Sequence, residues 1–330
     1  MLKFCEKTIK AKSEAVLALK PEIDAAVDKL CSDGYDNLFL VGIGGTYASG
    51  MEIEAYMKGH SKIKVYLENA ADLPALGHSE LTERSLVLIT SVTGNTPEVV
   101  AAVDYVHERG AKVIGFIDEK NVPLALKSDI LFSAPGDSYF KMLLFVLRLM
   151  KNAGEFPDYD EFCSQLENLP DALVDVQRKA DAKAETFASV HCDDNMHYVI
   201  GGGNLQGAAY SYAMCYMEEM LWMRTKFISA ADFFHGTLEV IERDTNVLVF
   251  AGEDDARVQT DRVLNFLPRI CGNITVFDTK DYALEGIADK FRGILSPMVI
   301  ASVYARLNVQ LEEARKHPME IRRYYRKLDY

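Results

Sequence analysis

Residues 37–47 read N-L-F-L-V-G-I-G-G-T-Y, an apolar run that ends in a glycine-rich turn. Because residues 38–41 are all apolar, the segment 37–41 predicts a strand that is buried on both faces. The glycines allow a sharp turn, and the residues 46–59 that follow predict a helix. A buried strand that passes through a glycine turn into a helix is the building unit of a parallel α/β sheet.

The same pattern continues on both sides of this stretch. An amphipathic helix is expected over 7–32, ahead of the first strand. Further helices are expected after Thr96, where Pro97 stands at an early helical position, and over 139–151. The other strands of this half are predicted at 64–67, 86–90, 112–117 and 130–133. Strands that alternate with helices predict a parallel sheet covered by helices on both faces.

A second α/β half is predicted after a helical stretch at 158–190 that contains no strand pattern. Its strands are predicted at 196–200, 246–250 and 274–277, with a long helix after the glycines 201–203 and further helices at 257–268 and 297–315. The second half therefore repeats the order of elements of the first.

The glycines of the two halves also correspond. A shift of 158 positions places Gly44 on Gly202. The same shift places Gly94 on Gly252, and two aligned strand–glycine junctions indicate duplicated halves. The expected parts are an N-terminal helical segment at 1–34, a first α/β domain at 35–155, a helical linker at 156–190, a second α/β domain at 191–316 and a C-terminal tail at 317–330.

The composition narrows the class of protein. A chain of 330 residues with 49% hydrophobic residues can form two cores, and its net charge of −13 disfavours nucleic acid and anionic membranes as partners. No two of the six cysteines form a C-x-x-C pair, and the start M-L-K-F-C-E-K lacks the apolar region of a signal peptide. The most apolar stretch, 142–150, contains Arg148 and is too short to span a bilayer. We therefore expect a soluble, cytoplasmic protein.

Two hydroxyl-rich turns indicate an anion site in the first half. They are G-G-T-Y-A-S-G at 44–50 and S-V-T-G-N-T at 91–96, each directly after a predicted strand. Glycines let backbone amides approach an anion, and the start of a helix supplies further N–H groups. The hydroxyls expected to bind a phosphate are those of Thr46, Ser91, Thr93 and Thr96. The alternative is that these residues only cap the helices that follow, because Ser and Thr are also favoured there.

Other parts of the chain argue against further ligands. Three carboxylates at 253–255 follow Gly252 and would repel phosphate, so we expect phosphate in the first half alone. The run G-I-G-G at 42–45 lacks the third glycine of a dinucleotide fingerprint, so no nicotinamide cofactor is expected. His191 and Cys192 are neighbours without a tetrahedral set of ligands, so no metal site is expected.

Three ionisable residues of the second half stand in apolar stretches of the sequence. The run A-M-C-Y-M-E-E-M-L-W at 213–222 places Glu218 and Glu219 in a largely apolar helix. Burial of an unpaired carboxylate raises its proton affinity, which suits a general base. His235 follows two phenylalanines and precedes a glycine. The alternatives are that both glutamates are solvated near Arg224 and that His235 is a structural histidine bound to a carbonyl.

The motifs G-G-T-Y, S-V-T-G-N-T-P-E and F-F-H-G, carried by two α/β halves, resemble those of the sugar isomerase (SIS) family. Residues 91–98 satisfy its most specific pattern, S-x-[ST]-G-x-T-x-E. The runs at 217–222 and 232–236 and the tail H-P-M-E-I-R-R-Y at 317–324 resemble one branch, the deglycases that act on 6-phosphorylated fructosamines. The resemblance extends from about residue 35 to the end of the chain.

This resemblance implies two tandem SIS domains, each a parallel sheet with flanking helices in a flavodoxin-like αβα sandwich. It implies that Glu219 is the general base and that His235, 16 positions further on, is the general acid or ring-opening histidine. It also implies a homodimer in which His235 approaches the site of the partner subunit, with no metal and no cofactor. Further substrate contacts are expected at Gly45, Asn95, Arg322, Arg323 and Tyr330.

The implied activity is hydrolysis of a 6-phosphorylated fructosamine to glucose 6-phosphate and a free amino acid. One alternative is an aldose–ketose isomerase or aminotransferase of the glucosamine-6-phosphate synthase type, although the Pro-Arg-Asn-Leu run of that synthase is absent. A deglycase for glucosyl-amino-acid 6-phosphates and a non-catalytic sugar-phosphate sensor are further alternatives. The chain has Ala230, Ala231 and Asp232 where the family usually has Ser-Gly-Glu, and the identity of the released amino acid stays open.

Overall fold

The computed structural model describes residues 1–329, and the chain divides into two compact units. The N-terminal unit consists of residues 7–171 together with 286–291. The C-terminal unit consists of residues 1–6, 172–285 and 292 onward. The position 171/172 at which they divide lies inside the segment expected to be a helical linker.

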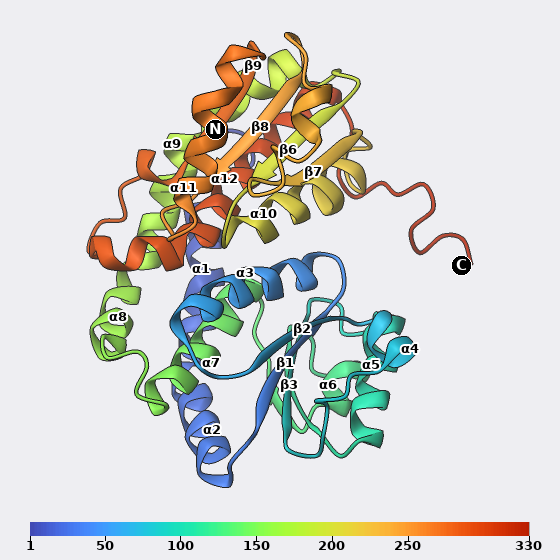
Figure 1. Ribbon diagram of the computed structural model, residues 1–330, viewed down its shortest axis with the longest axis vertical. Helices are drawn as coiled ribbons and strands as arrows, with labels where there is room; N and C mark the ends of the chain where they lie inside the picture. Colours follow the sequence, from blue (N-terminus) through green and yellow to red (C-terminus); the bar gives the residue numbers. More distant parts are fainter. Residues whose placement is uncertain (330) are drawn as a thin grey trace. The chain divides into compact units, whose positions relative to one another are not determined.

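The N-terminal unit contains a five-stranded sheet whose strands are all parallel (Figure 1). Its strands are β1 (Asn37–Gly42), β2 (Val65–Asn69), β3 (Ser85–Ser91), β4 (Lys112–Ile117) and β5 (Ile130–Phe132). They lie in the order β2-β1-β3-β4-β5, which is the flavodoxin-like order. The predicted parallel sheet is therefore confirmed.

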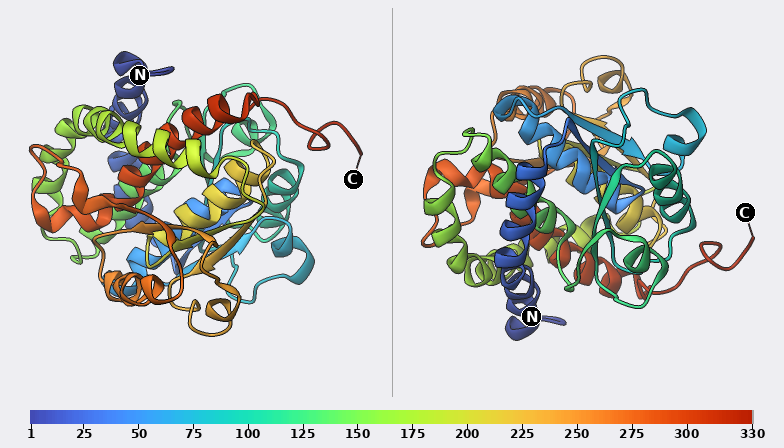
Figure 2. Two further views of the ribbon diagram at one scale, coloured as in Figure 1. Left: turned by 90° about the horizontal axis from the view of Figure 1, so that it is seen from above. Right: turned by 90° about the horizontal axis from the view of Figure 1, so that it is seen from below.

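Helices cover both faces of this sheet, as the buried strands require (Figure 2). They are α1 (Glu6–Ala18), α2 (Lys20–Asp33), α3 (Gly45–His60), α4 (Asp72–Leu76), α5 (Pro97–Glu108), α6 (Pro123–Lys127), α7 (Ser138–Asn152) and α8 (Tyr159–Gln165). Phe39, Val87 and Val113 belong to the core under α4, α5 and α6. On the other face α3 and α7 contact the strands, and α2 packs on α7.

The prediction of a single helix over 7–32 is wrong. The structure has two helices, α1 and α2, and Pro21 lies in the first turn of the second. Proline has no N–H to donate and its ring clashes with the carbonyl four residues earlier, so a continuous helix cannot pass through this position without a break.

The C-terminal unit repeats the architecture with a four-stranded parallel sheet in the order β7-β6-β8-β9. Its elements are α9 (Leu169–His191), β6 (His197–Gly201), α10 (Leu205–Ser211), a π-helix η2 (Tyr212–Glu218), β7 (Thr225–Ser229), β8 (Asn246–Ala251), α11 (Arg257–Phe266), β9 (Asn273–Asp278) and α12 (Arg292–Arg315). Short 3₁₀ turns of this unit lie at Thr237–Val240, Leu267–Arg269 and Thr279–Asp281, and those at Leu166–Asn168 and Asp289–Phe291 belong to the N-terminal unit. The fold is thus α/β with two SIS-like halves.

Three features of this unit differ from the predictions. Strand β7 was not predicted, because T-K-F-I-S is short and carries Lys226. The long helix expected after the glycines is regular only over α10 and then widens into the π-helix. The last helix begins at Arg292 rather than Pro297, and Pro297 lies inside it.

The internal proline of α12 has a compensating contact. Pro297 has no N–H for the carbonyl of Gly293, four residues before it. That carbonyl instead accepts a hydrogen bond of 2.8 Å from Nδ2 of Asn204. A side chain at the start of α10 therefore replaces the missing backbone donor.

The correspondence between the halves is offset by one residue from the prediction. Gly44 and Gly203 share the left-handed region, with φ of +59° and +55°, so the first junctions are related by a shift of 159 rather than 158. Gly94 also has a positive φ, of +63°, but Gly252 does not. The duplication is visible in the sheet order, whereas the second glycine pair of the predicted alignment is not equivalent.

Helix α12 and the residues just before it are long and apolar enough to cross a membrane by length and composition. In the residues that the structure describes this span is Asp289–Arg315, and 78% of its most apolar stretch is buried inside the protein. Burial of this kind is the property of a core helix, and α12 packs against α10.

Candidate functional site

The turn after β1 and the turn after β3 lie next to each other at one edge of the N-terminal sheet. The two strands are paired from Asn37↔Ser85 to Val41↔Ile89. The chain goes from β1 to β2 on one side and from β3 to β4 on the other, so the sheet order reverses between them. Ligands of open α/β sheets bind in the crevice at this reversal, beyond the carboxyl ends of the strands.

The first of these turns is held tight by Thr46. Its Oγ1 accepts a hydrogen bond of 3.1 Å from the Ile43 N–H and donates one of 3.0 Å to the Ile43 carbonyl. Gly42 has no room for a side chain, since a Cβ there would lie 2.6 Å from the Tyr47 nitrogen. Helix α3 begins at Gly45. The residue before it, Gly44, has no side chain that could cap the helix. The Thr46 hydroxyl thus shapes this turn.

The second turn is organised by Ser91 and Gly94. The buried Ser91 accepts a hydrogen bond of 2.9 Å at its Oγ from the Gly94 N–H. Thr93 and Asn95 are exposed on the turn. Thr96 occupies the residue position before α5, yet its side chain makes no capping hydrogen bond to the helix. The capping alternative therefore does not describe Thr96.

The equivalent turns of the C-terminal unit contain carboxylate side chains that are bound by other groups of the protein. Oδ2 of Asp254 accepts a hydrogen bond of 2.7 Å from the backbone N–H of Asn204, at the start of α10. Burial raises the pKa of Asp254 from its ordinary value, although the Asn204 N–H acts in the opposite direction. The neighbouring Glu253 carboxylate is bound by Arg292 through Nε at 2.9 Å and Nη2 at 2.8 Å. Internal carboxylates thus occupy the place where the N-terminal unit has hydroxyls.

Glu219 directly follows the π-helix and is paired with an arginine. Its Oε1 accepts a hydrogen bond of 2.9 Å from Nε of Arg322, and 31% of the Glu219 side chain is exposed. The carboxylate is thus paired, and its partner is Arg322 rather than the Arg224 of the solvated alternative. Glu218 is exposed and accepts a bond of 2.6 Å from the Thr225 hydroxyl, so the two glutamates have different partners.

His235 lies on a turn that is anchored by aromatic side chains. Phe233 is fully buried, and Phe234 packs edge-on against it and against Phe266. His235 itself is exposed, and within residues 1–329 no side-chain hydrogen bond or ion pair of its imidazole is present. Gly236 follows with φ of +129°. The two phenylalanines hold the turn in the core and leave the imidazole at the surface, unlike a histidine bound to a carbonyl.

Comparisons with known proteins agree with these motifs. Residues 35–146 match the family model of the SIS domain. The chain is 28% identical to fructosamine deglycase FrlB of Bacillus subtilis (strain 168), over 96% of this chain and 100% of FrlB. It is 22% identical to the fructoselysine 6-phosphate deglycase of Escherichia coli (strain K12), over 92% and 90% of the two chains.

A solved structure from Bacillus subtilis, provisionally named a phosphosugar isomerase, has the same fold along the chain. Its TM-score is 0.90 at 27% identity, and the match covers 96% of this chain and 100% of that one. Residues 35–146 of the chain are thus similar to the SIS domain, and the chain as a whole has the fold of this phosphosugar isomerase structure.

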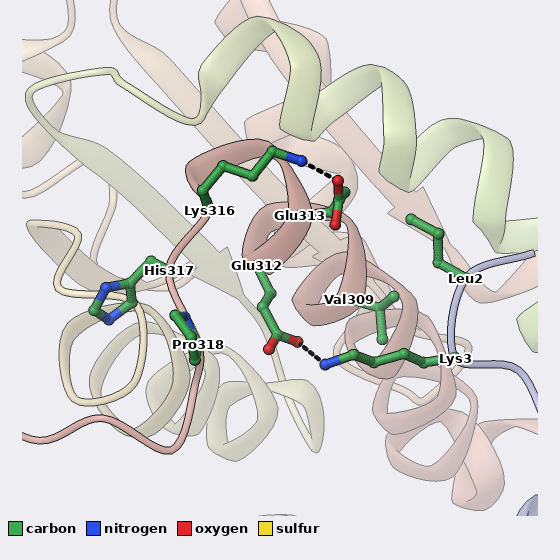
Figure 3. Close-up of a pocket in the computed structure, with 8 residues that line it drawn as sticks. All are labelled: Leu2, Lys3, Val309, Glu312, Glu313, Lys316, His317 and Pro318. Carbon is green, nitrogen blue, oxygen red and sulfur yellow. Dashed lines mark hydrogen bonds and ion pairs between the residues drawn. The ribbon is translucent and has the colours of Figure 1, made fainter.

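The protein also has a cavity away from these residues. It has a volume of about 290 Å³ and lies between the first residues of the chain and the end of α12 (Figure 3). Lys3 and Glu312 form an ion pair of 2.8 Å at its edge, and Lys316 pairs with Glu313. Of the expected site residues that the structure describes, none lines this cavity.

The structure distributes the expected site residues over both units. The phosphate-binding candidates belong to the N-terminal unit, and Glu219, His235, Arg322 and Arg323 belong to the C-terminal unit. Tyr330 lies outside the described residues. Among residues 1–329, no group of three or more His, Cys, Asp or Glu is arranged to hold a metal ion.

The contact between Glu219 and Arg322 was missed by the sequence analysis, which assigned Arg322 to the substrate. The two residues are 103 positions apart, so no local pattern connects them. The only signal in the sequence was the tail H-P-M-E-I-R-R-Y, which carries the arginine without indicating its partner.

Proposed function

We propose that this protein belongs to the SIS family and hydrolyses a 6-phosphorylated fructosamine to glucose 6-phosphate and a free amino acid. The observation that carries the proposal is the Glu219 carboxylate, which is partly exposed and held at Oε1 by the Arg322 guanidinium, so that its other oxygen can accept a proton from carbon. The full-length similarity to two proteins named as deglycases supports the same reaction.

In the proposed reaction, Glu219 removes a proton from C1 of the open-chain ketosamine and leaves an enaminol. Return of a proton to C2 gives the aldimine of glucose 6-phosphate. Water then adds to C1, the C1–N bond breaks, and the amino acid leaves with its nitrogen. We assign to His235 the transfer of a proton to the ring oxygen during ring opening, because its imidazole is exposed on an anchored turn.

We assign the phosphate to the two turns of the N-terminal unit. Ser91 is buried with its oxygen accepting from Gly94, which leaves its hydroxyl hydrogen to donate to a phosphate oxygen. Thr93 and Asn95 are exposed on the same turn, and the amides at the start of α3 and α5 add donors. We further propose Arg323, whose guanidinium lies 4.0 Å from the Trp222 ring centre, as a contact for the amino-acid carboxylate.

The test is incubation with 6-phosphofructosyl-lysine, with separate measurement of free amine and glucose 6-phosphate. Glu219→Gln should lower turnover by about 10²- to 10⁴-fold and leave binding of the phosphosugar nearly unchanged. Glu218→Gln is the matched control, since the adjacent carboxylate is exposed and bonded to Thr225. Full activity of Glu219→Gln would reject the assignment. Formation of a ketose or aldose phosphate without free amine would instead indicate the isomerase alternative.

We also propose a cytoplasmic homodimer in which the partner subunit supplies the imidazole. Glu219→Gln and His235→Ala would then each be inactive alone. After mixing and subunit exchange they should regain about a quarter of wild-type activity, the statistical limit for a dimer with two shared sites. Absence of recovery, with exchange of subunits shown by mass, would place both groups of a site on one chain.

A further inference from the structure

The C-terminal tail of the protein returns to the segment that follows the π-helix. After the end of α12, Nε2 of His317 lies 3.1 Å from the Met220 carbonyl oxygen. The His317 ring centre lies 4.2 Å from that of Trp222, and the Arg323 guanidinium covers the same indole at 4.0 Å. Trp222 has a positive φ of 55°, a conformation that is costly for a bulky residue and needs support from its surroundings. His317 and Arg323 provide contacts of this kind.

Between these two anchors, Arg322 reaches the Glu219 carboxylate. The distance from its Nε to Oε1 of Glu219 is 2.9 Å. Nη1 of the same guanidinium donates to the Ile321 carbonyl at 3.1 Å and also to the Met319 carbonyl, so backbone groups of the tail fix its orientation. Only 18% of the Arg322 side chain is exposed. A partly buried pair of this kind has less freedom than a surface ion pair.

The pairing uses one oxygen of the carboxylate. Within the described residues, Oε1 is the atom of Glu219 that accepts a hydrogen bond from a side chain, and Oε2 makes no such bond. A base that is held through one oxygen presents the other in a defined direction. Positioning of a reacting group to within about 1 Å is worth up to about 100-fold in rate.

We propose that Arg322 is a positioning residue: the tail carries it onto Oε1 of Glu219 so that Oε2 is aimed at the substrate carbon acid. This inference rests on the proposed function of Glu219 as the base. Arg322 acts through the glutamate, and the tail contacts of His317 and Arg323 set where its guanidinium lies.

The test compares kcat and KM of Arg322 variants with 6-phosphofructosyl-lysine as substrate. Arg322→Gln should lower kcat about 10- to 100-fold with KM changed less than about threefold, because the Glu219 carboxylate loses its fixed orientation while the groups that bind the substrate are unchanged. Arg322→Lys should recover part of kcat, since it keeps the charge without the fixed planar geometry. Lys327→Gln removes one cation from the same tail and should match the wild type. An unchanged kcat in Arg322→Gln would overturn the proposal, and so would an increase, which would show that the tail restrains the base.

The ion pair is also tested without substrate, because Trp222 is the only tryptophan of the chain. Arg322→Gln and Glu219→Gln break the same pair, so each should change the emission of Trp222 in the same way, and the double variant should add nothing. Emission unchanged in both single variants would overturn the pairing. A wild-type protein that releases no amine, but shows these emission changes, would reject the proposed function while the pairing stands.

Discussion

Gly94 shows how strongly a single backbone position determines the shape of the proposed phosphate turn. Its φ is +63°, and a Cβ added there would lie 2.2 Å from Cγ2 of Val122 and 2.9 Å from Cγ2 of Ile117. Its N–H donates to the Ser91 hydroxyl, and its carbonyl accepts a bond of 3.0 Å from the Leu124 N–H. The turn therefore requires glycine for its backbone conformation, for its packing and for the orientation of Ser91.

Replacing Gly94 with Ala should lower the free energy of unfolding by about 1–3 kcal/mol, because the new methyl group is strained in φ and overlaps Val122. It should also raise KM for the phosphosugar more than it lowers kcat, since the turn is assigned to the phosphate. Urea unfolding and steady-state kinetics measure the two effects. Gly59→Ala is the control: nothing lies within 4 Å of its added Cβ in α3, and a small gain in stability is expected. Equal stability of the two variants would contradict this account.

At the scale of elements, a side-chain hydrogen bond links α10 to α12 in the C-terminal unit and replaces a backbone hydrogen bond that α12 lacks. The proline inside α12 removes a backbone N–H, and the Asn204 side chain at the start of α10 donates to the carbonyl left behind, that of Gly293. Buried carbonyls without a partner cost free energy, so the proline and the asparagine are expected to depend on each other. The backbone N–H of Asn204 also donates a hydrogen bond to the Asp254 carboxylate. This bond connects the turn after β8 to the start of α10.

A double-mutant cycle measures this dependence. Asn204→Ala alone should lower the free energy of unfolding by about 1–3 kcal/mol, because the Gly293 carbonyl loses its donor. In a Pro297→Ala background the helix regains its own N–H, so the same Asn204→Ala change should cost less. Additive effects in chemical denaturation would show that the two residues are independent, contrary to this expectation.

At the scale of the whole molecule, both units have the same α/β plan, but the turns at their strand ends carry different chemical groups. The N-terminal unit has hydroxyls after β1 and β3, whereas the C-terminal unit has its own carboxylates bound to backbone and arginine. Carboxylates at that edge repel a phosphate. The groups at these turns therefore differ between the halves, although β2-β1-β3-β4 and β7-β6-β8-β9 follow the same order.

The C-terminal unit should lose stability in mild acid because of His197. This residue, at the start of β6, is fully buried with Nδ1 2.7 Å from Nδ2 of Asn246, and burial lowers its pKa from 6.5 to about 4. The folded state therefore binds fewer protons than the unfolded state between these values. The contribution of neutral His197 to the free energy of unfolding is complete above about pH 6.5. It is lost as the pH falls toward about 4, by up to about 1.4 kcal/mol per pH unit.

Urea unfolding at a series of pH values between 7 and 4 checks this expectation. His197→Gln removes the titrating group and should flatten the pH dependence in this window, even if its stability at pH 7 is lower. His107→Gln, an exposed histidine on α5, should leave the slope as in the wild type. A wild-type slope retained in His197→Gln would mean that other groups cause the acid sensitivity.

The strands and most helices were predictable because buried parallel strands are continuous apolar runs bounded by glycine or proline. Failures occurred where a longer-range contact changed a local rule. Pro21 divided the first helix, Pro297 was accepted inside α12 because Asn204 supplies a donor, and the short strand β7 gains its place by pairing with β6. The candidate residues Glu219 and His235 were chosen from motifs, but the partner of Glu219, Arg322, could not be predicted from them.

The sequence by itself determined the α/β plan, its duplication and the residue types that can bind phosphate or transfer protons. The plan and its duplication follow from the local periodicity of apolar residues, and the residue types are read directly from the sequence. Only the tertiary structure decided the partners of those groups: Arg322 for Glu219, Asp254 for the Asn204 amide, and Ser91 for the Gly94 amide. The physical reason is that hydrogen bonds and ion pairs act over a few ångströms in space. The fold brings Glu219 and Arg322 together although they lie 103 positions apart in sequence.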